Sequence, residues 1–472
     1  MVSCNAYVKV TSISLIILRL HFPAMGINRP FRIVLITIAA LLLLVVIFMV
    51  ASLSRINRDI DFDSLKEKME AKIDASDQAL VASDQGFLIG FSKVNLTPAK
   101  PVSTAGYGKR LGKLYRAVHD SIYVRTMIID NGKERVAVVS ADLLIIPPTV
   151  TALLEERLHD IGFSLNNTYL GATHSHNSIG NWAHGFTSFI YGTYEDSIVQ
   201  FIADRIQVGI KEATRNMVPA TAKIDSVSFR EGVYNRVVDD GPVDPKIRLI
   251  EIERQDSTKM LFVSYTAHAT CLYSRDLLLS ADWPGKLLQI MEEKGYDFTM
   301  FMAGAVGSHG PATPDGGWTC VDFMAENVAE RISTAAFTSM KSNYLEMHRI
   351  NLDLPEMQPK AFKRLRVKAA LFQTLFGQYQ SFINVLRFGD VVFLGTPCDF
   401  SGEFNFELDS IAASRNVFPM VTSFNGGYIG YLTPEKYYDV DHYETQLMNW
   451  YGPGNGEYVK DVLEKAMISV TE

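Results

Sequence analysis

Short runs of apolar and β-branched residues alternate with longer amphipathic stretches along most of this 472-residue chain. Such runs are typical of buried strands, and the stretches between them have the period of a helix. The predicted strands are residues 136–142, 168–174, 246–253, 260–268, 298–304 and 391–397, and the predicted helices include residues 150–158, 197–214 and 283–294. This order predicts an α/β fold in which mixed β-sheets are flanked by helices.

The composition excludes several classes of protein. Hydrophobic residues make up 47% of the chain and charged residues 21%, which suits a folded enzyme better than a disordered chain. The net charge of -7 argues against a nucleic acid as partner. The cysteines, Cys4, Cys271, Cys320 and Cys398, are too few and too scattered for a disulfide scaffold, and no CxxC pair indicates a zinc ribbon.

The N-terminal region predicts export. Residues 33–53 contain no charged side chain, so a transmembrane signal anchor is expected at residues 33–54. A signal peptide cut near Ala51 is the alternative, and in both cases the rest of the chain would lie outside the cytoplasm, in the periplasm or the extracellular space. Arginines stand on both sides (Arg29, Arg32, Arg55 and Arg58), so charge does not decide the orientation.

The remaining boundaries follow from composition. Residues 1–32 are expected to be a cytoplasmic leader or a mis-annotated extension, since Met25 would be a natural start. Residues 55–85 are charged, with apolar residues at helical spacing from Phe62 to Ile73, and predict a stalk helix. No Gly- or Pro-rich linker follows, so residues 86–472 are expected to form one catalytic domain.

Polar side chains that could take part in catalysis or bind a metal follow several predicted strands. His174 and His176 form an HxH pair, His268 ends another strand, and Asp399 follows a third. Singly each is a weak signal, because such histidines are more often hydrogen-bonded or buried in the core and such an aspartate is more often a helix N-cap. Because ligands bind at the carboxyl ends of strands in α/β sheets, we expect these side chains to cluster.

Several segments, in this order, resemble the neutral (non-lysosomal) ceramidase family, zinc amidases that cleave the N-acyl bond of ceramide. They are ATHSHNS, AHAT with SADWPG, FMAGAVGSHGP, GTPCDF and NGGYIGYLTPEKYYDVDHYE, and the opening GFSKVNLTPAKPVSTAGYG and AVHDSIYVR are also similar. The resemblance runs from about Gly86 to Gly452. Because the chain ends soon after this region, the resemblance indicates a short, divergent member of the family, of bacterial type.

The resemblance implies a site for Zn²⁺ and a set of residues around it. Its implied ligands are His174, His268, Asp399 and Tyr431, and the implied catalytic residues are His176 and Tyr443 at the oxyanion and Arg236 near the scissile amide. Asp399 stands where the family has glutamate, and Glu403 is the alternative ligand if Asp399 is a cap.

The family's Gly-Asp-x-Ser-Pro segment is altered here. Ser308 occupies its aspartate position and Gly310 its serine position, which argues against a serine nucleophile. Ser308, His309 and Asn235 are instead expected near the bound substrate. A tight glycine-rich turn beside the metal remains the simpler interpretation of Ser308 and His309.

The implied function is hydrolysis of the N-acyl amide bond of ceramide or a related N-acyl lipid by metal-activated water. The expected partners are this lipid substrate and, through the N-terminal helix, a membrane. Two alternatives stay open: a zinc hydrolase of another acyl amide or ester, and a membrane-anchored lipid-binding relative without catalysis.

Overall fold

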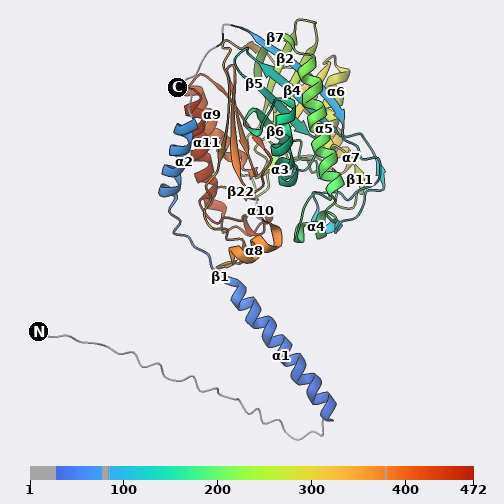
Figure 1. Cartoon of the computed structure of the whole chain (residues 1–472), viewed down its shortest axis with the longest axis vertical. Helices are drawn as coiled ribbons and strands as arrows, with labels where there is room; N and C mark the ends of the chain where they lie inside the picture. The colour runs from blue at the N-terminus through green and yellow to red at the C-terminus, as the bar shows by residue number, and fades with distance from the viewer. Residues whose placement is uncertain (1–27, 77–82, 84, 378–379, 472) are drawn as a thin grey trace, which may run out of the picture. The chain divides into compact units, whose positions relative to one another are not determined.

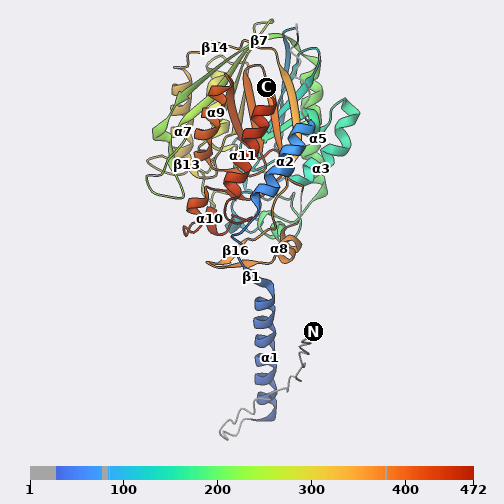
Figure 2. The same ribbon diagram turned by 90° about the vertical axis from the view of Figure 1, so that its left-hand side faces the viewer.

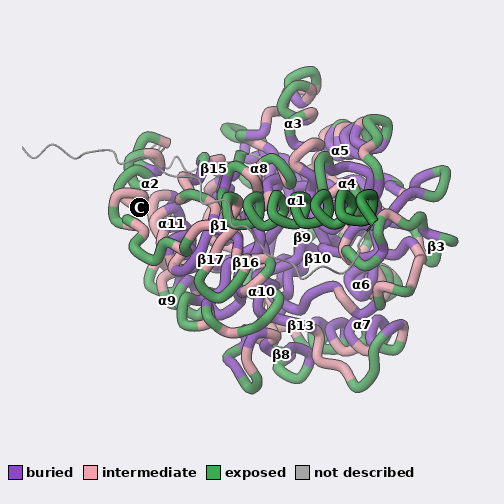
Figure 3. Tube along the Cα trace, turned by 90° about the horizontal axis from the view of Figure 1, so that it is seen from below, coloured by how far each residue is buried: buried purple, intermediate pink, exposed green. Residues whose placement is uncertain are grey.

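The computed structural model describes residues 28–76, 83, 85–377 and 380–471, which fall into two units, 1–52 and 53–472. In the first unit, α1 (Arg29–Ser52) is a 24-residue helix with no buried residue (Figure 3). A helix of this length is about 36 Å long, enough to cross a hydrocarbon core of about 30 Å. Most of the predicted leader, residues 1–27, lies outside the described residues.

The second unit has a large, nine-stranded sheet with helices on its outer face (Figure 1). The strand order is β12-β10-β9-β7-β2-β4-β5-β6, with β14 paired to β7. Its strands are β2 (Phe87–Asn95), β4 (Tyr123–Asp130), β5 (Arg135–Ala141), β6 (Thr168–Ala172), β7 (Val218–Ser228), β9 (Lys246–Arg254), β10 (Lys259–Tyr265), β12 (Phe298–Ala303) and β14 (Thr338–Ser339), and the helices are α3 (Pro148–Arg157), α5 (Asp196–Arg215), α6 (Asp282–Glu293) and α7 (Trp318–Ile332).

A four-stranded sheet packs against the inner face of the first, in the order β15-β18-β19-β21. Its outer face carries three more helices, so the unit has four layers, helix, sheet, sheet and helix (Figure 1). These elements are β15 (Leu345–Asn351), β18 (Phe382–Phe388), β19 (Val391–Thr396), β21 (Phe418–Ser423), α2 (Phe62–Ser76), α9 (Asn405–Ser414) and α11 (Asn455–Ser469). Aromatic and aliphatic side chains of both sheets fill the space between them, as in a sandwich core.

Short elements join these layers. They are three two-stranded pairs, β3 (Ala117–Val118) with β11 (Leu278–Leu279), β8 (Val233–Asn235) with β13 (His309–Pro311) and β20 (Asp399–Phe400) with β22 (Tyr431–Leu432), and the helices α4 (Phe186–Tyr191), α8 (Ala369–Phe376) and α10 (Tyr443–Gln446). The predicted α/β class is confirmed, and all six predicted strands and all three predicted helices are present. Two strands end two or three residues earlier than predicted, β6 at Ala172 and β10 at Tyr265.

The predicted stalk is wrong in one respect. A helix is present there, but α2 is packed on the domain and is not a free stalk: Met69 and Ile73 are completely buried in the core that it shares with α11 (Figure 2). Lys66 and Lys72 pair with Asp461 and Asp353 of the domain. The apolar spacing is the same for a stalk and a docked helix, so only the partner surface distinguishes them.

The large sheet curls so strongly that its two edge regions meet. β6 and β12, at opposite ends of the strand order, contact one another, and Ser140 of β5 donates to the carbonyl of Phe301 in β12 at 2.5 Å. Strand twist accumulates across a wide sheet and produces such closure. The carboxyl ends of β6 and β10 are thereby brought close together in space.

Candidate metal centre

His174 leaves β6 through a turn and not as extended chain. Its φ is +64°, in the left-handed region that side chains with a Cβ rarely adopt. Its ring stacks on Phe424 with centroids 3.9 Å apart, and its Nδ1 donates to the carbonyl of Leu144 at 2.6 Å. Because that carbonyl only accepts, the proton resides on Nδ1 and leaves the lone pair of Nε2 free. The two rings of the HxH pair do converge, but by this turn.

Three imidazole nitrogens meet at one point in the described structure. The Nε2 of His174 lies 2.7 Å from that of His268 and 3.1 Å from that of His176, and the last two are 3.2 Å apart. Burial holds the pKa of His174 at about 3 and those of His176 and His268 well below the usual value. The three side chains are therefore neutral, and imidazoles in this state are metal ligands.

Asp399 places a carboxylate beside these nitrogens. It lies on β20, which pairs in parallel with β22 so that Asp399 is directly opposite Tyr431. Its Oδ2 accepts from Tyr428 at 2.7 Å, whereas its Oδ1 is 3.5 Å from His174 Nε2 and 3.8 Å from His268 Nε2. Complete burial raises its pKa to about 7, against the hydrogen bond from Tyr428 and the charge of Arg236.

Asp399 Oδ1 is a buried acceptor without a hydrogen-bond partner among the described residues. Such an atom is costly unless a cation or another donor reaches it. Together with the neutral imidazoles it forms the nitrogen and oxygen donor set that zinc prefers. The side chains present therefore fit a divalent metal.

Neighbouring hydrogen bonds distinguish the two candidate carboxylates, Asp399 and Glu403. Asp399 is not a helix cap, because Ser401 caps the following turn by accepting from the backbone of Glu403. Glu403 is bound elsewhere: its carboxylate accepts from Asn235 at 2.9 Å and pairs with Lys436 at 3.0 Å. Asp399 is thus the carboxylate that faces the histidines.

Arg236 and Tyr443 border the same centre. One guanidinium nitrogen of Arg236 is 3.1 Å from His268 Nδ1, and another pairs with the buried Glu444 at 2.8 Å. Burial opposes its charge, but Tyr431 and Glu444 raise its pKa, so it remains a cation. The ring of Tyr443 meets that of Tyr431 edge-on with centroids 5.9 Å apart, and its side chain is 49% exposed.

The three residues expected near the substrate lie behind these groups. Asn235 and His309 face one another across β8 and β13, and both are buried, as is Ser308. His309 Nε2 accepts from the backbone of Asp244 at 2.9 Å, so the ring proton is on Nδ1 and is donated to Ser308 Oγ at 2.7 Å. A histidine in this tautomer cannot take a proton from Ser308, which argues against a dyad.

A cavity of about 1530 Å³ opens onto the candidate centre. Its walls include His174, His176, Arg236, Asp399, Tyr431 and Tyr443, but not Asn235, Ser308 or His309. Another part of the wall consists of aromatic and aliphatic side chains, those of Trp182, Phe186, Ile190, Phe372, Phe376 and Trp450. This wall, much of it from α4 and α8, was missed in the sequence, where only the apolar run 369–376 hinted at it.

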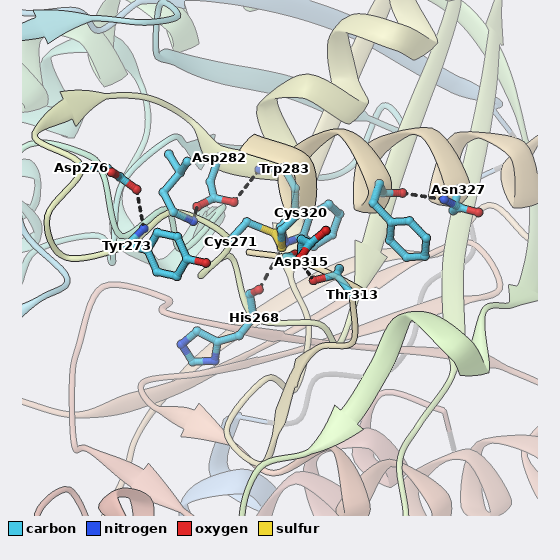
Figure 4. Close-up of a disulfide and its surroundings, with 12 residues drawn as sticks. His268, Cys271, Tyr273, Asp276, Asp282, Trp283, Thr313, Asp315, Cys320 and Asn327 are labelled. Atoms are coloured by element: carbon cyan, nitrogen blue, oxygen red, sulfur yellow. Dashed lines mark hydrogen bonds between the residues drawn. A yellow bond between two sulfur atoms is a disulfide. The ribbon is translucent and has the colours of Figure 1, made fainter. Parts of the chain in front are cut away.

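A disulfide stands three residues beyond His268. Cys271 pairs with Cys320 on α7, and the indole of the nearby Trp283 donates to the carbonyl of His268 at 3.2 Å (Figure 4). Cys398, next to Asp399, is free and buried. The disulfide therefore ties the loop after His268 to a helix of the outer layer.

Replacing Cys271 and Cys320 together by serine is expected to lower the free energy of unfolding by about 4 kcal/mol, because the pair closes a long loop in the unfolded chain. The sequence separation is 49 residues. Denaturant unfolding under oxidising conditions measures the change. A reductant should bring the unsubstituted protein to the same stability and leave the double variant unaffected; equal stability of the two oxidised proteins would contradict the expectation.

Comparisons with known proteins bear on the family and the fold of the chain. The family model for the neutral/alkaline non-lysosomal ceramidase, N-terminal, matches residues 87–336, which include His174, His176, Arg236 and His268. A crystal structure of neutral ceramidase from Pseudomonas aeruginosa superposes with a TM-score of 0.70 at 16% identity, covering 82% of this chain and 75% of that one. A ceramidase complexed with C2 gives 0.68 at 16% identity, with the same coverage. The structural likeness shows a shared fold.

Proposed function

The chain belongs to the neutral/alkaline non-lysosomal ceramidase family, and on this premise we propose that it is a zinc-dependent hydrolase of the N-acyl amide bond of ceramide or a related N-acyl lipid. One observation supports this most directly. The unpartnered Oδ1 of Asp399 and the three neutral imidazoles lie beside a large cavity whose lining includes many aromatic and aliphatic side chains.

The proposed ligands are His174, His268, Asp399 and Tyr431. His174 and His268 are the two histidines within 4 Å of Asp399 Oδ1, and Tyr431 is its cross-strand neighbour. A zinc ion held there would polarise the amide carbonyl and activate water for attack. The buried hydrogen bond from His174 Nδ1 to Leu144 fixes its ring, as outer contacts of metal ligands commonly do.

The remaining polar groups suit charge that develops on the amide oxygen. Arg236 is held by Glu444 and keeps its positive charge beside the centre. The hydroxyl of Tyr443 and, in the tautomer with its proton on Nε2, the imidazole of His176 can donate hydrogen bonds into the cavity. Donors fixed in advance in this way stabilise a tetrahedral oxyanion.

The cavity favours a lipid as substrate. Its volume of about 1530 Å³ exceeds that of pockets for small polar metabolites. Phe186 and Leu447, both on its wall, are 48% and 62% exposed, so apolar surface continues to the outside. A long acyl chain can enter along such a surface without leaving an apolar environment.

The catalytic domain is proposed to lie outside the cytoplasm, with α1 as its membrane anchor. If the N-terminal segment is cleaved, the domain is secreted. The uncharged stretch of α1 supports a membrane span or signal sequence. The disulfide between Cys271 and Cys320 adds independent support, because such bonds persist mainly in oxidising compartments.

The function is tested with the full chain in non-ionic detergent and ceramide labelled in its acyl chain. Release of labelled fatty acid that is abolished by a chelator and restored by zinc is the expected result. No release by folded, zinc-loaded protein would discard ceramide, and a panel of other N-acyl lipids, N-acyl amino acids and esters would then identify the bond. Zinc binding without turnover of any of them would favour a lipid-binding relative.

Replacing Arg236 by glutamine is expected to lower kcat by roughly 100-fold with a small change in KM, because the guanidinium acts on charge that appears in the transition state. Arg236 also contacts His268, so zinc content is measured in parallel and should stay unchanged. Arg230→Gln, a matched change of a more distant arginine, should keep wild-type kinetics. A rise in KM alone would assign Arg236 to substrate binding.

A further inference from the structure

The residues that follow α1 are built into a small sheet of the second unit. β1 (Leu53–Arg55) pairs with β17 (Leu365–Val367), which pairs with β16 (Lys360–Phe362), and both pairings are antiparallel (Figure 3). The turn between β16 and β17 consists of Lys363 and Arg364. We refer to these three strands and their turn as the basic sheet.

The basic sheet carries positive charge that the protein itself does not neutralise. Arg366 pairs with Glu356 at 2.7 Å and the neighbouring Arg58 with Asp439 at 2.6 Å. In contrast, no carboxylate among the described residues pairs with Arg55, Lys363 or Arg364, and all three are exposed. Exposed cations gathered at one place attract anions.

A pocket of about 630 Å³ lies beside this sheet, apart from the catalytic cavity. Five cationic side chains line it, Arg55, Arg58, Lys360, Lys363 and Arg364, against one carboxylate, that of Asp439. Lys360 is partly buried there: it donates to the carbonyl of Tyr438 and lies 3.5 Å from the centroid of its ring. Guanidinium and ammonium groups in such a concave site are suited to a phosphate group.

The position of the basic sheet in the chain indicates where that phosphate comes from. Arg55 is three residues beyond Ser52, the last residue of α1. Three extended residues reach at most about 11 Å, so a bilayer crossed by α1 keeps its headgroups within reach of this sheet. Phe362, next to the turn, is 64% exposed, and a lone aromatic ring among cations is typical of the bilayer interface.

We propose that the basic sheet and its pocket bind the phosphate headgroups of anionic phospholipids. The last strand of the basic sheet, β17, is followed closely by α8, which begins two residues after it. This helix contributes Phe372, Gln373 and Phe376 to the catalytic cavity. Docking here would therefore place this wall of the cavity at the bilayer surface. The binding itself requires no catalysis and stands independently of the proposed hydrolysis.

The experiment titrates the full chain in non-ionic detergent with phosphatidylglycerol or phosphatidylcholine and counts bound lipids by native mass spectrometry. Phosphatidylglycerol is expected to bind in clear preference, and the preference should weaken with salt. In the double variant Lys363→Gln, Arg364→Gln its affinity should fall by roughly 10- to 30-fold, because each cation near a lipid surface contributes about a fivefold factor.

The matched control is Lys211→Gln, Arg215→Gln on the exposed side of α5, which removes the same charge and should keep the preference. If the pocket is the binding site, the single variant Arg55→Gln should bind phosphatidylglycerol with an affinity about fivefold lower. Equal binding of both lipids, an unchanged preference in the double variant, or an equal loss in the control would each overturn the proposal. Displacement of phosphatidylglycerol by inorganic phosphate at comparable concentration would overturn the assignment to lipid.

Discussion

The His268→Ala variant is expected to lose bound zinc and at least about three orders of magnitude in kcat/KM for ceramide. His268 is completely buried, and its Nε2 lies within 4 Å of Asp399 Oδ1 and of both other imidazoles. A metal that polarises the carbonyl contributes several kcal/mol to the transition state, and each 1.4 kcal/mol is about tenfold in rate. Zinc content by elemental analysis and steady-state kinetics on the full chain measure both losses.

Thermal unfolding gives a readout of His268→Ala that does not depend on activity. A chelator should lower the Tm of the unsubstituted protein, because a metal that binds only the folded state stabilises it. It should leave the variant unaffected. His159→Ala, at an exposed position outside the centre, is the control and should keep zinc and rate. A variant that retains both zinc and activity would rule out His268 as a ligand.

The parts of the site that could be predicted from the sequence are those that follow long strands. β6, β10 and β19 are largely apolar, and His174, His268 and Asp399 come within three residues of their ends. Strand ends in α/β sheets gather at one edge, so separate motifs could be placed together. Their actual approach also depends on the curling of the large sheet, which no local pattern encodes.

Other parts of the site depend on contacts without a sequence period. β20 and β22 are only two residues long, yet their pairing sets Tyr431 opposite Asp399. The positive φ of His174 also depends on such contacts. The HxH pair alone predicts extended chain, whereas the surrounding packing imposes a turn. The resemblance to a family named these residues, and the structure shows how they come together.

The error at α2 and the unrecognised basic sheet have a common cause. Residues 55–85 and 360–368 are both rich in charge, and charge on its own indicates exposure without indicating a partner. In α2 two buried residues, Met69 and Ile73, decide that the helix is docked. In the basic sheet the pairing of strands more than 300 residues apart, Leu53 with Val367, creates a patch that neither segment shows alone.

The His176→Ala variant is expected to keep its zinc and to lose roughly 100- to 1,000-fold in kcat, the usual cost of removing one oxyanion donor. His176 borders the cavity, and its Nε2 lies 3.1 and 3.2 Å from those of His174 and His268. In contrast with those two, it makes no ion-pair contact with Asp399 among the described residues. That asymmetry supports the proposal that His176 acts on the substrate and not as a metal ligand.

The spacing of the three nitrogens also permits His176 to be a third imidazole ligand, and zinc content separates the two roles. Loss of zinc from His176→Ala, with recovery in His176→Cys, would make it a ligand, since a thiolate binds zinc. Retention of zinc with a fall in kcat and an unchanged KM would assign it to the transition state, because only groups that act on developing charge have that kinetic signature. His176→Gln, which keeps a hydrogen-bond donor, should then recover part of the rate.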